Sequence, residues 1–248
     1  VMLWIALAVL LAGYLQGALG FGFPFVATPM VAMVTDMRTA VITILLPTLA
    51  TTVVTLFTSG PLGPVLARFW MMPVYSILGA LAGTWLFVAL PAAPYQLLLA
   101  LIIIVYLNLD RIARGNWPLI RRHERAFGPL AGAVAGVFEG TANVAAPPLI
   151  IYYLALGLAP AMLVQALNIC FLVGKSVQFA VLTARGGVTA AQWLATLPFV
   201  LISVAAFFTG ARVRNRIDAP TFHVWVKRAL LVIALVLFAR YAYQTWRG

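Results

Sequence analysis

The chain has 248 residues, of which 64% are hydrophobic and 8% charged, with a formal net charge of +11. A soluble domain carries about 25% charged residues, so this composition, with a mean hydropathy of +1.06, predicts an integral membrane protein. The basic residues lie at the ends of apolar segments, which excludes the solvated basic face of a nucleic-acid-binding protein. The single cysteine, Cys170, excludes an intrachain disulfide, and the two distant histidines, His123 and His223, argue against a metal site.

Ten apolar segments follow one another along the chain and predict an all-α polytopic membrane protein with eight to ten membrane segments. We expect the first to be structural rather than a signal peptide, because it lacks a basic start and a typical cleavage site. The second, sixth and seventh are short for a span of about 20 residues. The pairs 1/2 and 6/7 are therefore either tilted helices or hairpins that enter and leave on one side. The ten segments are 2–20, 23–34, 39–58, 69–90, 95–109, 127–139, 142–157, 160–182, 191–211 and 223–243.

If these segments cross a membrane one after another, most of the basic residues lie on one side of it. Eleven of them, including Arg68 and the cluster in 110–126, fall on one side, and four, including Arg38 and Arg185, fall on the other. Short cytoplasmic loops carry an excess of Lys and Arg. We therefore expect both termini outside and the 110–126 linker in the cytoplasm.

The two halves on either side of this linker resemble each other. Both have the same order of segments, and a shift of 119 residues superposes three positions, with Gly13, Gly17 and Pro29 falling on Gly132, Gly136 and Pro148. Each half has an odd number of crossings, so the second half is predicted to be inverted relative to the first, as in many secondary transporters. Each repeat would have a broken or re-entrant helix pair followed by three transmembrane helices. The predicted domains are a first repeat at 1–109, a basic linker at 110–126 and a second repeat at 127–248.

A break rich in glycine and proline interrupts the first segment pair of each half. The two breaks read "GALGFGFPFVATPM" at 17–30 and "GVFEGTANVAAPP" at 136–148. Non-helical backbone at membrane depth is tolerated only where protein or a water-filled cavity satisfies it. The free N–H groups of the helix that restarts after a break attract anions.

These breaks, the two-repeat plan, the chain length and the basic central linker resemble the TauE/SafE family of sulfite exporters, also called toluene-sulfonate uptake permeases. The resemblance covers essentially the whole chain. It implies export or uptake of small sulfur oxyanions or organosulfonates across a bacterial inner membrane.

Segment 160–182 carries polar residues that suit an anion site. Gln165, Asn168, Lys175 and Gln178 fall on roughly one face of a helix. A lysine in mid-span is costly and usually faces an interior cavity, and its ammonium group suits the oxygens of sulfite or a sulfonate. Two interpretations stay open for Lys175: it contacts the substrate, or it pairs with Glu139 or snorkels to the interface.

Residues of the two breaks complete the candidate site. Asn143 either donates its amide to an oxyanion or caps the helix that restarts after the break. Glu139, the only acid in the apolar region, carries a coupling proton, pairs with Lys175 or lies at a cavity mouth. The threonines of segment 39–58 either line a cavity or bond their own helix backbone. The remaining candidate substrate contacts are Thr28, Thr141, Gly20, Gly22 and Gly140.

Together these features predict a secondary transporter that works by alternating access and exports small sulfur-containing anions, such as sulfite or sulfoacetate, with proton coupling as an option. The alternatives are a transporter of another small anion, such as thiosulfate or a carboxylate, and a membrane scaffold subunit that transports nothing. The sequence offers no paired carboxylates and no nucleophile with a base, so we expect no enzyme, no cofactor and no metal. The expected partners are the anionic substrate and the lipid bilayer, and a homodimer is left open.

Overall fold

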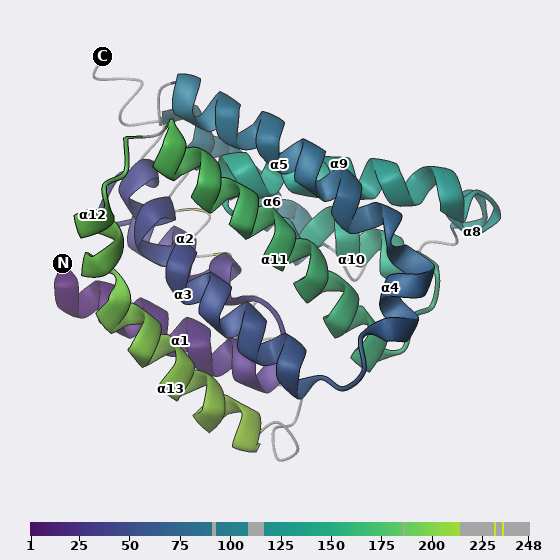
Figure 1. Ribbon diagram of the computed structural model, residues 1–248, viewed down its shortest axis with the longest axis horizontal. Coiled ribbons are helices and arrows are strands. Elements are labelled where there is room, and N and C mark those ends of the chain that lie inside the picture. The colour runs from purple at the N-terminus through teal and green to yellow at the C-terminus, as the bar shows by residue number, and fades with distance from the viewer. Residues whose placement is uncertain (91–92, 109–116, 186, 214–230, 232–234, 236–248) are drawn as a thin grey trace. The chain divides into compact units, whose positions relative to one another are not determined.

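The computed structural model describes residues 1–90, 93–108, 117–185 and 187–213, together with Leu231 and Leu235 (Figure 1). Within these ranges every regular element is a helix, as predicted. The last predicted segment, 223–243, lies outside the described residues apart from two positions, and so does His223.

The helices follow the predicted apolar segments closely. Among the described residues, five stretches are long and apolar enough to cross a membrane: α1 (Met2–Leu19), α3 (Met37–Thr58), α5 (Met71–Ala89), α11 (Pro160–Ala184) and Ala190–Val213, which α12 (Ala190–Ala195) and α13 (Leu197–Val213) share. The chain is therefore a multi-pass membrane protein. The other helices are α2 (Phe23–Ala32), α4 (Gly63–Phe69), α6 (Ala93–Leu107), α8 (Pro118–Arg122), α9 (Glu124–Ala142) and α10 (Ala146–Ala155).

The predicted linker is partly helical. Residues 109–116 lie outside the described part of the chain, but α8 follows them and α9 begins at Glu124, before the predicted start at 127. Pro118 lies in the first turn of α8, where its missing N–H has no intrahelical partner to lose. Glu124 begins α9, where a carboxylate suits the positive end of the helix dipole.

The chain forms two compact units. Unit 1 contains residues 1–51, 91–107 and 193–248, and unit 2 contains 52–90 and 108–192, so the boundary lies inside α3. Each unit takes segments from both predicted halves of the sequence. The compact units are defined by contacts and the repeats by the order of segments in the sequence, so the units do not test the repeats. The division into repeats at 1–109 and 127–248 remains a prediction.

In unit 1, α1 and α2 form a helical hairpin. Gly20 ends α1 with a φ of 84° and Gly22 precedes α2 with a φ of 112°, values that glycine adopts readily. Trp4, at the start of α1, donates its indole N–H to the carbonyl oxygen of Met30, near the end of α2, at 2.8 Å. α2 therefore returns to the end where α1 begins. Of the two alternatives for this pair, tilted helices or a hairpin, the structure has the hairpin.

In unit 2, α9 and α10 form a hairpin of the same kind. Asn143 ends α9 with a φ of 64°. Tyr152 of α10 donates its hydroxyl to the carbonyl oxygen of Glu124 at 3.0 Å, which joins the end of the hairpin to its beginning. The ten residues of α10 rise about 15 Å, half of a hydrocarbon layer of about 30 Å. α10 alone is therefore too short to cross such a layer.

Each hairpin packs against one long helix through its glycines. Figure 1 shows α1 beside α13 and α5 beside α9. A Cβ atom on Gly17 of α1 would overlap the carbonyl oxygen of Phe207 in α13, and a Cβ atom on Gly136 of α9 would overlap the carbonyl oxygen of Ser76 in α5. Small residues at these positions permit the close approach of two helix backbones.

The close contacts of Gly13 and Gly17 correspond to those of Gly132 and Gly136, a shift of 119 residues, whereas the residues that end and restart the helices correspond under a shift of 123. This register places Gln16, Gly20 and Pro24 on Glu139, Asn143 and Pro147. The glycines at 128, 132, 136 and 140 recur every four residues, about one helical turn. A slip of one turn therefore leaves the glycine pattern almost unchanged, and the sequence alone could not fix the register.

Candidate functional site

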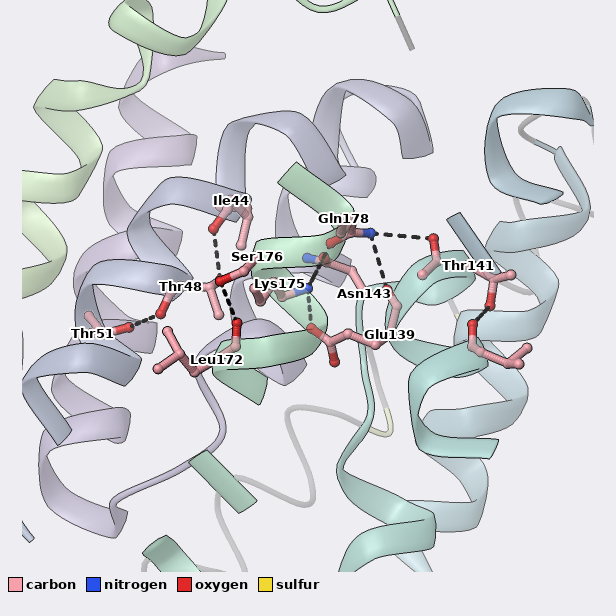
Figure 2. Close-up of polar contacts among 12 residues, drawn as sticks. Ile44, Thr48, Thr51, Glu139, Thr141, Asn143, Leu172, Lys175, Ser176 and Gln178 are labelled. Carbon is pink, nitrogen blue, oxygen red and sulfur yellow. Dashed lines mark hydrogen bonds and ion pairs between the residues drawn. The ribbon is translucent and has the colours of Figure 1, made fainter. Parts of the chain in front are cut away.

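Lys175, in the second half of α11, has a fully buried side chain. Its ammonium group forms an ion pair with Oε1 of Glu139 and donates hydrogen bonds to Oδ1 of Asn143 and, at 3.1 Å, to Oε1 of Gln178. Figure 2 shows these side chains converging on the Lys175 nitrogen. An ammonium group has three donors, so all of them have an acceptor.

The end of α9 supplies most of this cluster. Glu139 and Asn143 are four residues apart, about one turn, so their side chains lie on the same face at the hairpin tip. Gln178 lies three residues after Lys175 on α11 and donates its amide to the carbonyl oxygens of Glu139 and Gly140, at 3.1 and 3.3 Å. The last carbonyls of a helix lack intrahelical donors, so Gln178 satisfies two of them and fastens the hairpin tip to α11.

The cluster is electrically balanced. The Glu139 side chain is 1% exposed and meets Lys175 through Oε1, while its Oε2 has no hydrogen-bond partner among the described residues. Removing one partner of a buried ion pair leaves an uncompensated charge, which costs several kcal/mol. An anion that joined this cluster would make its net charge negative unless the Glu139 carboxylate also took up a proton.

Two buried hydroxyl groups of α5 also lack a partner among the described residues, those of Ser76 and Thr84. A Cβ atom on Gly174 of α11 would lie 3.0 Å from Cγ of Glu139 and 3.8 Å from Oγ of Ser76. The Ser76 hydroxyl and the Glu139 side chain therefore both lie next to Gly174. Ser76 was not among the predicted site residues, because a lone serine in an apolar helix usually bonds its own backbone.

The other polar candidates of α11 lie away from Lys175. Gln165 donates its amide to two carbonyl oxygens in the loop after α3, at 2.6 and 3.4 Å, and Asn168 donates to a carbonyl one turn earlier in its own helix, at 2.8 Å. Ten and seven residues before Lys175 correspond to about 15 and about 10 Å along a helix. Of the four residues predicted to share a face, Lys175 and Gln178 bond each other, at 3.1 Å.

Asn143 does not cap the helix that restarts after the break. The residue before α10 is Ala145, and no side chain caps that helix. Asn143 instead ends α9, where its backbone N–H bonds the carbonyl oxygen of Glu139 at 3.1 Å, and its side-chain oxygen accepts from Lys175.

The remaining candidates divide between the two units. In unit 2, Thr141 donates its hydroxyl to a carbonyl of its own helix at 2.7 Å, and Gly140 lies against the backbone of α5. Gly20, Gly22 and Thr28 belong to unit 1, where they form or follow the corresponding break. The threonines of α3 favour the structural interpretation, since own-helix carbonyls accept the hydroxyls of Thr48, Thr51 and Thr58 at 2.7, 2.9 and 2.9 Å.

Comparison with known families gives a match over nearly the whole chain. Residues 5–241 match the family described as "Sulfite exporter TauE/SafE". No curated protein and no solved structure matches the chain. The matched range includes both hairpins and every residue of the Lys175 cluster.

Proposed function

Because the chain belongs to the TauE/SafE family of sulfite exporters, a family of membrane transporters, we propose that it exports small sulfur-containing anions such as sulfite or sulfoacetate by alternating access. The observation that carries this proposal is the fully buried Lys175 at the tip of a helical hairpin. Secondary transporters bind their substrates near the bilayer midplane, at broken helices. A charged residue at that depth usually marks the pathway.

In the proposed binding step, the anion replaces Glu139 as the partner of Lys175. The three donors of the ammonium group suit the oxygens of sulfite or a sulfonate, and bonds between ionised groups are the strong ones. A rotation of the Asn143 amide would turn its NH₂ group toward an oxygen of the anion. Gln178 keeps its bonds to the end of α9 and holds the hairpin tip in place during the exchange.

A proton accompanies the anion in this scheme. The buried pair of Lys175 and Glu139 is neutral, and an added anion would leave an uncompensated negative charge in a medium where such a charge is costly. For a singly charged anion such as hydrogen sulfite, protonation of Glu139 restores neutrality and releases Lys175 to the anion. Anion and proton then cross in the same direction, and export occurs when the anion is concentrated in the cytoplasm.

Transport measurements in liposomes test the proposed function. The purified protein should carry sulfite and sulfoacetate, and the comparison anions are thiosulfate and acetate. Lys175→Met should abolish saturable flux, while Arg185→Gln, which removes an exposed charge at the end of α11, should leave it unchanged. Absence of flux for every anion would contradict the transporter proposal and favour a scaffold subunit.

We propose further that the protein lies in a bacterial inner membrane with both termini outside and the start of α9 in the cytoplasm. In unit 2, four arginines at residues 68, 121, 122 and 125 line one end, as the positive-inside rule requires. A cysteine at the exposed position of His123, in a Cys170→Ser background, should resist a membrane-impermeant reagent in intact cells and react in inside-out vesicles. Ready labelling in intact cells would reverse the orientation.

A further inference from the structure

A cavity of about 680 Å³ lies in unit 2 at the end where α9 begins. The end of α4, the start of α5, α8, the start of α9 and Tyr152 of α10 form its walls. The walls contain four arginines, one histidine and one glutamate. These residues are Arg68, Arg121, Arg122, His123, Glu124 and Arg125.

Two of the arginines are fixed by contacts within the unit. Arg68 donates from Nε and Nη2 to the two carboxylate oxygens of Glu124, at 3.0 and 3.1 Å. Arg121 donates from Nε to the carbonyl oxygen of Ala155 at 2.7 Å. These bonds tie α4 to the beginning of α9, and α8 to the end of α10.

The other two arginines are available to a ligand. Arg122 and Arg125 are exposed, and within the described ranges neither side chain has a hydrogen-bond or ion-pair partner. Among the described residues that line the cavity, Glu124 is the one carboxylate, and it already pairs with Arg68. Within this described lining, the three guanidinium charges on Arg121, Arg122 and Arg125 therefore have no opposing carboxylate.

The chemistry of these walls suits an oxyanion with several oxygens. A guanidinium group is a planar fork that matches phosphate geometry with paired hydrogen bonds. The cavity is separate from the Lys175 cluster, since Pro129, the last α9 residue in its walls, lies ten residues before Glu139, about 15 Å along the helix. Its volume suits a phosphate together with the group that carries it, because small-molecule sites measure roughly 300–1,000 Å³.

We propose that this basic cavity is a second anion site, which binds a phosphate group carried either by an anionic phospholipid headgroup or by a soluble phosphate. Basic pockets at the cytoplasmic ends of membrane helices attract anionic headgroups. A phosphate held by Arg121, Arg122 and Arg125 bridges α8 and α9, so its binding stabilises the entrance of the α9–α10 hairpin. This site is independent of the anion that the protein transports.

The test measures the binding of two probes to the full chain. The first is phosphatidylglycerol in nanodiscs, with phosphatidylcholine nanodiscs as the reference, and the second is inorganic phosphate. The double variant Arg122→Gln/Arg125→Gln should weaken binding about tenfold or more, at about 1 kcal/mol for each arginine. The control, Arg185→Gln/Arg212→Gln, removes two exposed charges outside the cavity and should change binding less than about twofold. Preference for phosphatidylglycerol identifies the lipid as the source of the phosphate, and binding of inorganic phosphate identifies a soluble source.

The proposal is overturned if neither probe binds, or if the control weakens binding as much as the cavity variant does. A second variant tests the sign of the effect. Glu124→Gln releases Arg68 from its ion pair and adds a positive charge to the walls, so binding should become tighter. Unchanged or weaker binding in Glu124→Gln contradicts a role for these wall charges.

Discussion

Gln16 and Glu139 occupy the same position in the two helix breaks, since each is buried and lies four residues before the left-handed residue that ends its helix. Gln16 accepts the backbone N–H of Phe23 at 3.0 Å and donates to the carbonyl oxygen of Gly20 at 3.4 Å, so it joins the two sides of its break. Glu139 instead pairs with Lys175. One break is held by a neutral amide and the other by an ion pair.

This relationship predicts the effect of exchanging the two side chains. Glu139→Gln should fold, because the other break carries an amide at that position, and its anion flux should lose the dependence on pH that the carboxyl group gives. Flux in liposomes across a series of pH values measures this. Gln16→Glu is the reciprocal control and should lower the melting temperature, because it replaces a buried neutral amide with a buried carboxylate. Retained pH dependence in Glu139→Gln would exclude Glu139 as the proton carrier.

The ion pair itself predicts a coupled loss of stability. Lys175→Met leaves the Glu139 carboxylate buried without a counter-charge and should lower the free energy of unfolding by about 3–5 kcal/mol. Lys175→Met/Glu139→Gln removes both charges, so it should be much more stable than the sum of the two single changes implies. Denaturant titrations of the four proteins measure the coupling. Additive effects would show that the two residues do not interact energetically.

The unpartnered hydroxyl of Ser76 predicts an unusual response to truncation. Removing a buried polar group that has no hydrogen bond is neutral or stabilising, so Ser76→Ala should not lower the melting temperature. Ser203 is the matched control, because it occupies the corresponding place in α13 and donates its hydroxyl to the carbonyl oxygen of Val200 at 2.7 Å. Ser203→Ala should cost about 1 kcal/mol. A larger loss in Ser76→Ala than in Ser203→Ala would contradict this account of α5.

The close helix contacts predict that two glycines cannot accept a methyl group. Gly136→Ala and Gly17→Ala place a Cβ atom against a carbonyl oxygen of the neighbouring helix, and such overpacking costs about 1–3 kcal/mol. Gly63→Ala is the control, since no atom lies within 4 Å of its added Cβ. Thermal unfolding in detergent compares the three variants. Equal melting temperatures for all three would rule out the tight packing of α9 on α5 and of α1 on α13.

Asp36, between α2 and α3, predicts one pH effect on stability. Partial burial raises the pKa of its carboxyl group, but hydrogen bonds from the hydroxyl of Thr39 at 2.6 Å and from the backbone N–H of Thr39 at 3.0 Å outweigh it and lower the pKa. A lowered pKa stabilises the fold above the ordinary pKa of the group, and this stabilisation is lost as the pH falls. Asp36→Ala should cost about 1 kcal/mol near neutral pH and less in acid. A constant difference between the two proteins at all pH values would contradict this role.

The sequence predicted the helices and their membrane character well, because long apolar runs and glycine–proline breaks report local structure directly. It also proposed the pairing of Lys175 with Glu139 as one of two interpretations. The shared face of Gln165 and Asn168 with Lys175 was less informative, since residues two or three turns apart on one face need not meet. Side chains that share a helix face point in the same direction, but they can lie far apart along the helix axis.

The features that the sequence did not reveal all depend on which helices pack together. The repeat register was ambiguous by one turn, since the glycine contacts match under a shift of 119 residues and the ends of α1 and α9 match under a shift of 123. Ser76 became a candidate only because α5 packs on α9. In the basic cavity, Arg68 lies next to the arginines of 121–125. Arg68 is 56 residues before its partner Glu124, so no pattern of neighbouring residues in the sequence could have predicted this contact.

Proton uptake on anion binding tests the central claim most directly, that an anion takes the place of Glu139 at Lys175. Methanesulfonate is the suitable probe, because it carries a single charge, whereas sulfite itself binds protons near neutral pH and sulfoacetate carries two charges. On binding methanesulfonate, the purified protein in weak buffer should take up about one proton for each anion bound and so raise the pH, and Lys175→Met and Glu139→Gln should show no such change. Methanesulfonate binding without proton uptake, or undiminished binding to Lys175→Met, would contradict the proposed site.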